Sequence, residues 1–261
     1  MRLTTTKDAA MTRLRALVYG DSGIGKTTSL RTLPEKFTAI AAAERGLIPL
    51  REYNYPVYTL ESWEDMQELV KVFREPVTVD GRPIKVLGID SLSELSDFCK
   101  QKILHKDRPE LLHERTHGKS EKPAGVYDDL MTMEDWGLYR TRMTNMLSAA
   151  CHLPVHVIFT SLAAWVEDKR TGGLFRTPNM NGKLALECPA FFDVVLHMES
   201  MDTTDGDDKP IVSRVWRTAH DGRIIAKDAS GVLDPFEPAD WTALMRKIAK
   251  NGNGNGKAVT T

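Results

Sequence analysis

Residues 20–27 have the sequence Gly-Asp-Ser-Gly-Ile-Gly-Lys-Thr, which matches the Gly-x-x-x-x-Gly-Lys-Thr pattern of a phosphate-binding loop. The apolar run 14–19 before the loop predicts a buried strand, and residues 28–33 after it predict a helix that ends before Pro34. A strand, a glycine loop and a helix in this order aim backbone N–H groups and the positive end of a helix dipole at a phosphate chain. The pattern therefore predicts an α/β fold that binds a nucleoside triphosphate.

Two side chains of the loop have expected tasks beyond wrapping the phosphates. The Lys26 ammonium is expected to reach the β- and γ-phosphates, and the Thr27 hydroxyl is expected to ligate Mg²⁺. The expected nucleotide-binding residues are Gly20, Asp21, Ser22, Gly23, Ile24, Gly25, Lys26, Thr27 and Thr28.

The rest of the chain alternates predicted strands with predicted helices, which favours a mostly parallel central sheet with helices on both faces. Further strands are predicted at 37–43, 84–90 and 155–161, and helices at 62–73, 91–102 and 138–150. Two late strands, 193–198 and 211–216, flank an acidic turn and predict an antiparallel hairpin, and Asp-Gly at 221–222 predicts a second turn into 223–227.

The chain is expected to form a single ATPase domain over residues 1–248. Residues 105–135 are polar and aperiodic, which predicts an insertion, and a short helix is expected near 240–248. Residues 249–261 contain repeated Asn-Gly and predict a flexible tail.

A carboxylate follows the predicted strand 84–90, where a P-loop enzyme needs one to hold Mg²⁺. This residue is Asp90, and we assign it to the metal. Glu44 ends the strand 37–43 and is the expected general base for the attacking water, provided that this strand neighbours the first.

Composition excludes several classes of protein. The formal net charge of −1 gives no global attraction to nucleic acid, so any such surface must be local. The three cysteines are far apart, which fits a reduced cytoplasmic protein better than a disulfide framework. No apolar run has the length of a membrane span, so no membrane association is expected.

Three segments together resemble the ATPase core of RecA-type recombinases: residues 19–28, residues 41–47 (Ala-Ala-Ala-Glu-Arg-Gly-Leu) and residues 88–92 (Gly-Ile-Asp-Ser-Leu). The resemblance implies a RecA-like P-loop NTPase fold in which Glu44 activates water. It also implies that Thr160 and Ser161 form the γ-phosphate sensor, although most RecA proteins have glutamine or asparagine there.

Within that group the chain is most similar to small phage-encoded RecA-like ATPases, including the Sak-type single-strand annealing proteins. Asn-Gly-Lys at 181–183 and Phe-Asp-Val at 192–194 carry this likeness, which covers residues 12–235. The resemblance implies an ATP- and Mg²⁺-dependent, DNA-stimulated ATPase of phage recombination that binds single-stranded DNA and promotes annealing or strand pairing. It further implies a homo-oligomer, as a ring or filament, that can meet a single-strand binding protein. The segments that flank the core of long RecA proteins have no expected counterpart here, which favours an annealing or accessory role.

A basic, glycine-containing loop is predicted at 165–183, where RecA-type proteins have their second DNA-binding loop. Its cations would pair with phosphates, and an aromatic side chain would stack on a base. The DNA-binding candidates are Lys169, Arg170, Arg176 and Lys183. Lys227, or Arg223, is the candidate for a cation that acts across a subunit interface.

Two other classes of function remain as alternatives. A motor or remodelling ATPase, of the helicase-loader or packaging type, would act on a protein partner. A small-molecule kinase or GTPase is disfavoured because the chain lacks the guanine-specifying Asn-Lys-x-Asp pattern and an arginine-rich lid.

Overall fold

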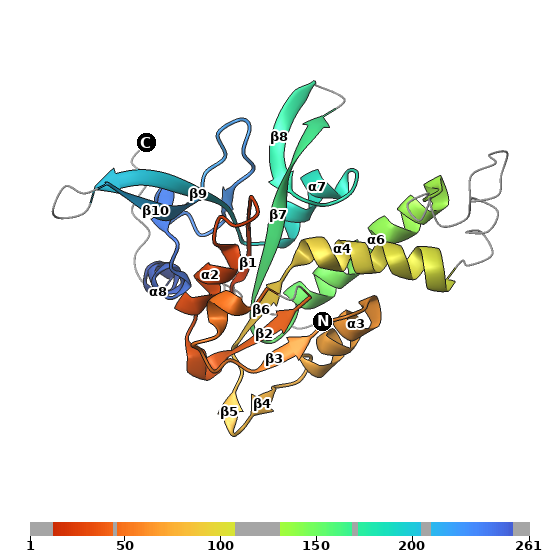
Figure 1. The fold of residues 1–261 in the computed structure, drawn as a ribbon, viewed down its shortest axis with the longest axis horizontal. Helices are drawn as coiled ribbons and strands as arrows, with labels where there is room; N and C mark the ends of the chain where they lie inside the picture. Colours follow the sequence, from red (N-terminus) through yellow and green to blue (C-terminus); the bar gives the residue numbers. More distant parts are fainter. Residues whose placement is uncertain (1–12, 44–45, 108–130, 169–171, 205–209, 253–261) are drawn as a thin grey trace.

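The computed structural model describes residues 13–43, 46–107, 131–168, 172–204 and 210–252. Its centre is one twisted sheet with the strand order β12-β10-β9-β1-β7-β6-β2-β3 (Figure 1). The strands of this path are β1 (Arg15–Gly20), β2 (Thr38–Ala42), β3 (Val57–Thr59), β6 (Val86–Asp90), β7 (His156–Asp168), β9 (Val194–Thr204), β10 (Pro210–Arg217) and β12 (Phe236–Pro238).

The parallel part of the sheet places the phosphate loop at its centre. β1 pairs in parallel with β7 on one side and with β9 on the other. β6 pairs in parallel with both β7 and β2, and β2 pairs in parallel with β3. The predicted mostly parallel sheet is confirmed, and β2 is separated from β1 by β6 and β7.

The late part of the sheet is antiparallel. β9 and β10 form the predicted hairpin, and β12 adds to β10 as the edge strand. The expected strand at 223–227 is wrong: only β11 (Lys227–Asp228) is a strand, and it pairs with β9. Asp221 instead accepts hydrogen bonds from the backbone N–H groups of Arg223 and Ile224, which close a local turn.

Helices cover both faces of the sheet because alternate strand residues point to opposite sides. One face packs under α3 (Trp63–Val72), α4 (Leu92–Gln101) and α6 (Met133–Cys151). The other face packs under α2 (Lys26–Ser29) with its 3₁₀ extension η1 (Leu30–Thr32), and under α8 (Trp241–Gly252). Figure 1 shows the first group on the right of the view and α8 on the left.

The helix boundaries follow local capping chemistry. Ser62 caps α3, because its hydroxyl accepts the Asp65 N–H at 3.2 Å. Thr132 and Asp135 form a reciprocal capping box that starts α6 five residues before the expected start at 138. α8 runs four residues past its expected end at 248.

The expected loop over 165–183 is wrong in large part. β7 continues to Asp168 and turns back as β8 (Gly173–Pro178), so the two strands form an antiparallel hairpin with Trp165 opposite Arg176. The hairpin rises beyond the rest of the sheet (Figure 1). It is followed by α7 (Leu184–Glu187) and the 3₁₀ turn η5 (Cys188–Phe191).

Several short elements escaped the sequence patterns. These are η2 (Glu35–Phe37), η3 (Ile48–Leu50), the small hairpin of β4 (Thr78–Val79) and β5 (Arg82–Pro83), and a π-helical turn, η4 (Lys102–Asp107). The expected insertion at 105–135 lies mostly outside the described residues. No helix in the described ranges has the length and apolar character needed to cross a bilayer.

Candidate nucleotide-binding site

The phosphate loop joins the end of β1 to the start of α2. Gly25 is the N-cap of α2 and has φ 110°, a backbone conformation that favours glycine over residues with a side chain. The Ser29 N–H donates to the Gly25 carbonyl at 2.9 Å, which fixes the first helical turn directly behind the loop. The positive end of this turn points toward the loop, and the sequence predicts that it binds an anion there.

Lys26 lies folded over the loop that it follows. Its ammonium donates to the carbonyl oxygens of Gly20 at 3.1 Å and Asp21 at 2.8 Å, and the residue is only 9% exposed. These contacts hold the charge at the mouth of the loop, where it can pair with incoming phosphate oxygens.

Thr27 and Asp90 meet although 62 residues separate them along the chain. Asp90 ends β6, and its Oδ2 accepts a hydrogen bond from the Thr27 hydroxyl at 2.7 Å. Its Oδ1 accepts the Thr160 hydroxyl, so both carboxylate oxygens are held. Asp90 is 3% exposed and Thr160 is fully buried, so the carboxylate has a fixed orientation beside the loop.

The donor set at this point suits Mg²⁺. A hydroxyl and a carboxylate are hard oxygen ligands, and Mg²⁺ in phosphoryl-transfer sites needs only one or two such protein ligands besides phosphates and water. Thr27 and Asp90 would hold the ion together with the nucleotide.

Ser161, the second predicted sensor residue, faces a different partner. Its hydroxyl lies 3.2 Å from the hydroxyl of Ser93 on α4, and the Leu162 N–H donates to Ser93 at 3.0 Å. Thr160 and Ser161 thus attach β7 to the end of β6 and to the start of α4. They lie behind Asp90 and are fully buried.

Glu44, the expected base, lies outside the described residues. The strand before it does not neighbour β1, which the prediction required, because β6 and β7 lie between them. Its end lies beside Asp90 instead, since Ala42 pairs with Asp90 and the Ala43 N–H donates to the Asp90 carbonyl at 2.7 Å.

Arg176 of β8 reaches the phosphate loop instead of solvent. Its guanidinium forms an ion pair with Asp21, and its side chain is 12% exposed whereas that of Asp21 is 71% exposed. The guanidinium also lies 5.2 Å from the centre of the Trp165 ring. This contact neutralises a carboxylate that would otherwise repel phosphate, and it connects the β7–β8 hairpin to the loop.

Tyr19 and His197 lie next to each other at the base of the phosphate loop. The Tyr19 hydroxyl lies 2.7 Å from the Ile225 carbonyl oxygen and 2.9 Å from that of Arg176, and burial raises the pKa of this phenol, which keeps it protonated. His197 packs edge-on against Tyr19, and burial lowers the pKa of its imidazole. A neutral pair therefore lies under the phosphate-binding residues.

The structure does not bring the remaining described candidates, Lys183, Lys227 and Arg223, to the phosphate loop. Lys169 and Arg170 lie outside the described residues, and Lys183 is exposed at the N-cap of α7. Lys227 donates to the Phe192 carbonyl at 2.7 Å, which holds its side chain against its own subunit, and Arg223 is exposed.

Sequence reasoning missed one cation beside the loop, Arg214 on β10. Its side chain lies against Gly25. The pattern around Arg214 is that of an ordinary strand, and only the pairing of β10 with β9 brings it near residue 25.

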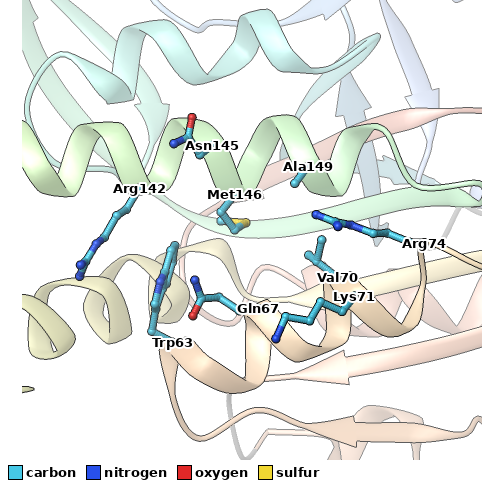
Figure 2. A pocket seen from close by; sticks show the side chains of 9 residues that line it. All are labelled: Trp63, Gln67, Val70, Lys71, Arg74, Arg142, Asn145, Met146 and Ala149. Atoms are coloured by element: carbon cyan, nitrogen blue, oxygen red, sulfur yellow. The ribbon is translucent and has the colours of Figure 1, made fainter.

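A separate pocket of about 260 Å³ lies between α3 and α6 (Figure 2). Trp63, Val70 and Met146 give it apolar walls, and the view places Arg142 at one end and Arg74 at the other. None of its lining residues belongs to the phosphate loop or to the Thr27–Asp90 pair, so the pocket is not part of the nucleotide site.

A match to a protein family agrees with this site. A family model described as an AAA domain matches residues 12–230. No curated protein matches the sequence. Among solved structures, the chain is similar to the flagellar accessory protein FlaH from Methanocaldococcus jannaschii, with 10% identity, a TM-score of 0.39, and coverage of 87% of this chain and 88% of that one. It is also similar to the cytoplasmic domain of the type VII secretion ATPase EccC from Thermomonospora curvata, with 11% identity, a TM-score of 0.32, and coverage of 77% of this chain and 21% of that one.

Proposed function

We propose that this chain, which belongs to the AAA domain family of P-loop ATPases, is an ATPase stimulated by single-stranded DNA. The family supports ATP binding and hydrolysis. The DNA-dependent part of the proposal is supported by the β7–β8 hairpin, which extends from the nucleotide site and is tied back to it by the Arg176–Asp21 ion pair.

The residues beside the loop have different roles in hydrolysis. Lys26 pairs with the phosphate chain and neutralises charge that develops in the transition state. Mg²⁺, held by Thr27 and Asp90, would supply further charge neutralisation. Thr160 keeps the Asp90 carboxylate in one orientation, and Glu44 accepts a proton from the attacking water.

The hairpin has the properties of a stacking platform. Trp165 is 57% exposed on β7, and the Arg176 guanidinium lies over its ring. An exposed aromatic ring can stack on a base, and we expect Lys169, Arg170 and Lys183 to pair with backbone phosphates. This is the observation that favours single-stranded DNA over the other classes of ligand.

The biological role that follows is homologous recombination of the phage type, in which the protein promotes annealing or strand pairing. We propose that it acts as a homo-oligomer, a ring or a filament on the strand, in the cytoplasm, and meets a single-strand binding protein there. Arg223, which is exposed, would then be the better candidate to face the site of the next subunit, because the Lys227 ammonium is held by the Phe192 carbonyl of its own subunit.

A direct test measures the binding of a fluorescent oligo-dT by anisotropy, with and without ATP and Mg²⁺. Trp165→Ala should weaken binding about tenfold, because one stacked base contributes about 1–3 kcal/mol. Met133→Ala is the matched control, since Met133 is 87% exposed on α6 and far from the hairpin in sequence and fold. Equal affinities of wild type and Trp165→Ala would remove the hairpin from DNA binding.

The remodelling alternative is favoured by a different property of the same hairpin. Leu174 is also 57% exposed, so the hairpin presents two apolar side chains that a protein partner could cover. This alternative predicts that the protein leaves the anisotropy of oligo-dT unchanged and that oligo-dT leaves the rate of ATP hydrolysis unchanged.

A further inference from the structure

Arg214 lies in direct contact with the phosphate loop. A β-carbon built on Gly25 would be 2.7 Å from Arg214 Nε and 2.8 Å from its Cδ, which is closer than real side chains approach. The arginine stem therefore occupies the space beside the N-cap of α2, and the residue is nevertheless exposed to solvent.

The sheet order decides which end of a bound nucleotide Arg214 approaches. Asp90 on β6 and Thr160 on β7 lie on one side of β1, whereas β9 and β10 lie on the other. Thr27 and Asp90 would hold Mg²⁺ and so would place the γ-phosphate of a bound nucleotide on the Asp90 side. Arg214 reaches the loop from the opposite side of β1, where the α-phosphate and the nucleoside would lie.

The guanidinium is available for an anionic ligand. Among the described residues, no carboxylate forms an ion pair with Arg214, and the loop's own Asp21 is paired with Arg176. The backbone around it is held in place, because the Arg214 carbonyl accepts the Ala239 N–H and the residue pairs with Ser200 of β9. A planar guanidinium can donate two parallel hydrogen bonds to phosphate oxygens.

We propose that Arg214 is a nucleotide-positioning residue that binds the α- and β-phosphates within its own subunit. This inference rests on the nucleotide site of the proposed function, and it does not depend on DNA. It assigns Arg214 to the part of the ligand that ADP and ATP share, in contrast to Asp90 on the other side of β1.

The test compares ADP and ATP affinities of wild type, Arg214→Ala and Arg214→Lys, measured by titration calorimetry for Mg·ADP and by KM for ATP hydrolysis. Arg214→Ala should raise the ADP dissociation constant and the ATP KM by the same factor, about tenfold, and should leave kcat within about twofold. Arg214→Lys should recover part of the loss, which a merely structural role of the side chain would not predict. Arg246→Ala, an exposed arginine on α8, is the matched control and should bind ADP as wild type does.

Two results would overturn the proposal. One is an unchanged ADP affinity in Arg214→Ala. The other is a loss of kcat in Arg214→Ala that is restored when Arg214→Ala subunits are mixed with Lys26→Ala subunits. Such complementation would show that Arg214 acts at the neighbouring subunit's site. Failure of wild type to bind ADP at all would instead refute the nucleotide site itself, so the two failures are distinguishable.

Discussion

At the scale of single residues, the site depends on the two oxygens of one carboxylate. Asp90 is almost fully buried, which is unfavourable for a charge unless hydrogen bonds compensate. Thr27 of α2 and Thr160 of β7 supply those bonds, one on each oxygen. The Thr160 hydroxyl therefore links β7 to the carboxylate at the end of β6.

Thr160→Val removes one of these bonds and keeps the side-chain shape. We expect ATP hydrolysis to fall at least tenfold, because a misoriented Asp90 would hold Mg²⁺ poorly, with a stability loss of about 1–3 kcal/mol from the lost buried hydrogen bond. Hydrolysis and urea unfolding check the two effects. Thr38→Val, at a buried threonine of β2 whose hydroxyl donates to Pro34, is the control that should lose stability and retain hydrolysis. Equal rates in the two variants would contradict the assignment.

Glu44→Gln separates binding from turnover. The amide keeps the size of the side chain and cannot accept the proton of the attacking water, so we expect Mg·ATP affinity to stay within about threefold and kcat to fall at least a hundredfold. Calorimetry and steady-state hydrolysis measure the two quantities. Wild-type turnover in this variant would show that another residue is the base.

At the scale of elements, sequence patterns predicted those features that depend on residues close together in the chain. The phosphate loop, its flanking strand and helix, and the Ser62 cap were all predictable, because each depends on residues within about four positions. The β7–β8 hairpin was not, since its residues have no clean alternation and its strands are stabilised by pairing with each other. The partner of Arg176 and the place of Arg214 depend on strand register across the sheet, which no local pattern carries.

Thr132→Ala tests the start of α6. The capping box satisfies backbone N–H groups at residues 132 and 135, so its loss should lower the free energy of unfolding by about 1 kcal/mol. Thr141→Ala on the exposed face of the same helix should be neutral or slightly stabilising, because alanine has the higher helix propensity. Urea unfolding of both variants gives the comparison, and equal losses would rule out the box as a stabilising feature.

At the scale of the whole molecule, stability should depend on pH through buried histidines. Burial, followed by the nearby charge of Arg13, lowers the pKa of His156 below 6.5, and the imidazole Nδ1 accepts the Leu14 N–H at 2.8 Å. The folded protein therefore favours neutral His156, whereas the unfolded chain binds a proton near pH 6.5. This contribution to stability is complete above the unfolded pKa and is lost as the pH falls below it.

Wild type should accordingly lose unfolding free energy between pH 7.5 and 5.5, and His156→Gln should lose less over the same interval. His197, which burial shifts in the same direction, leaves a residual slope in that variant. Urea titrations at the two pH values measure the difference. Identical slopes would show that His156 titrates alike in the folded and unfolded states.

The central claim is that nucleotide turnover at the loop is coupled to single-stranded DNA at the hairpin. ATP hydrolysis measured with and without oligo-dT, with Lys26→Ala as the blank, tests it most directly. The account predicts hydrolysis that oligo-dT stimulates several-fold in wild type and that is absent in Lys26→Ala. Hydrolysis that is equal with and without DNA would contradict the coupling and would favour an ATPase that acts on a protein partner.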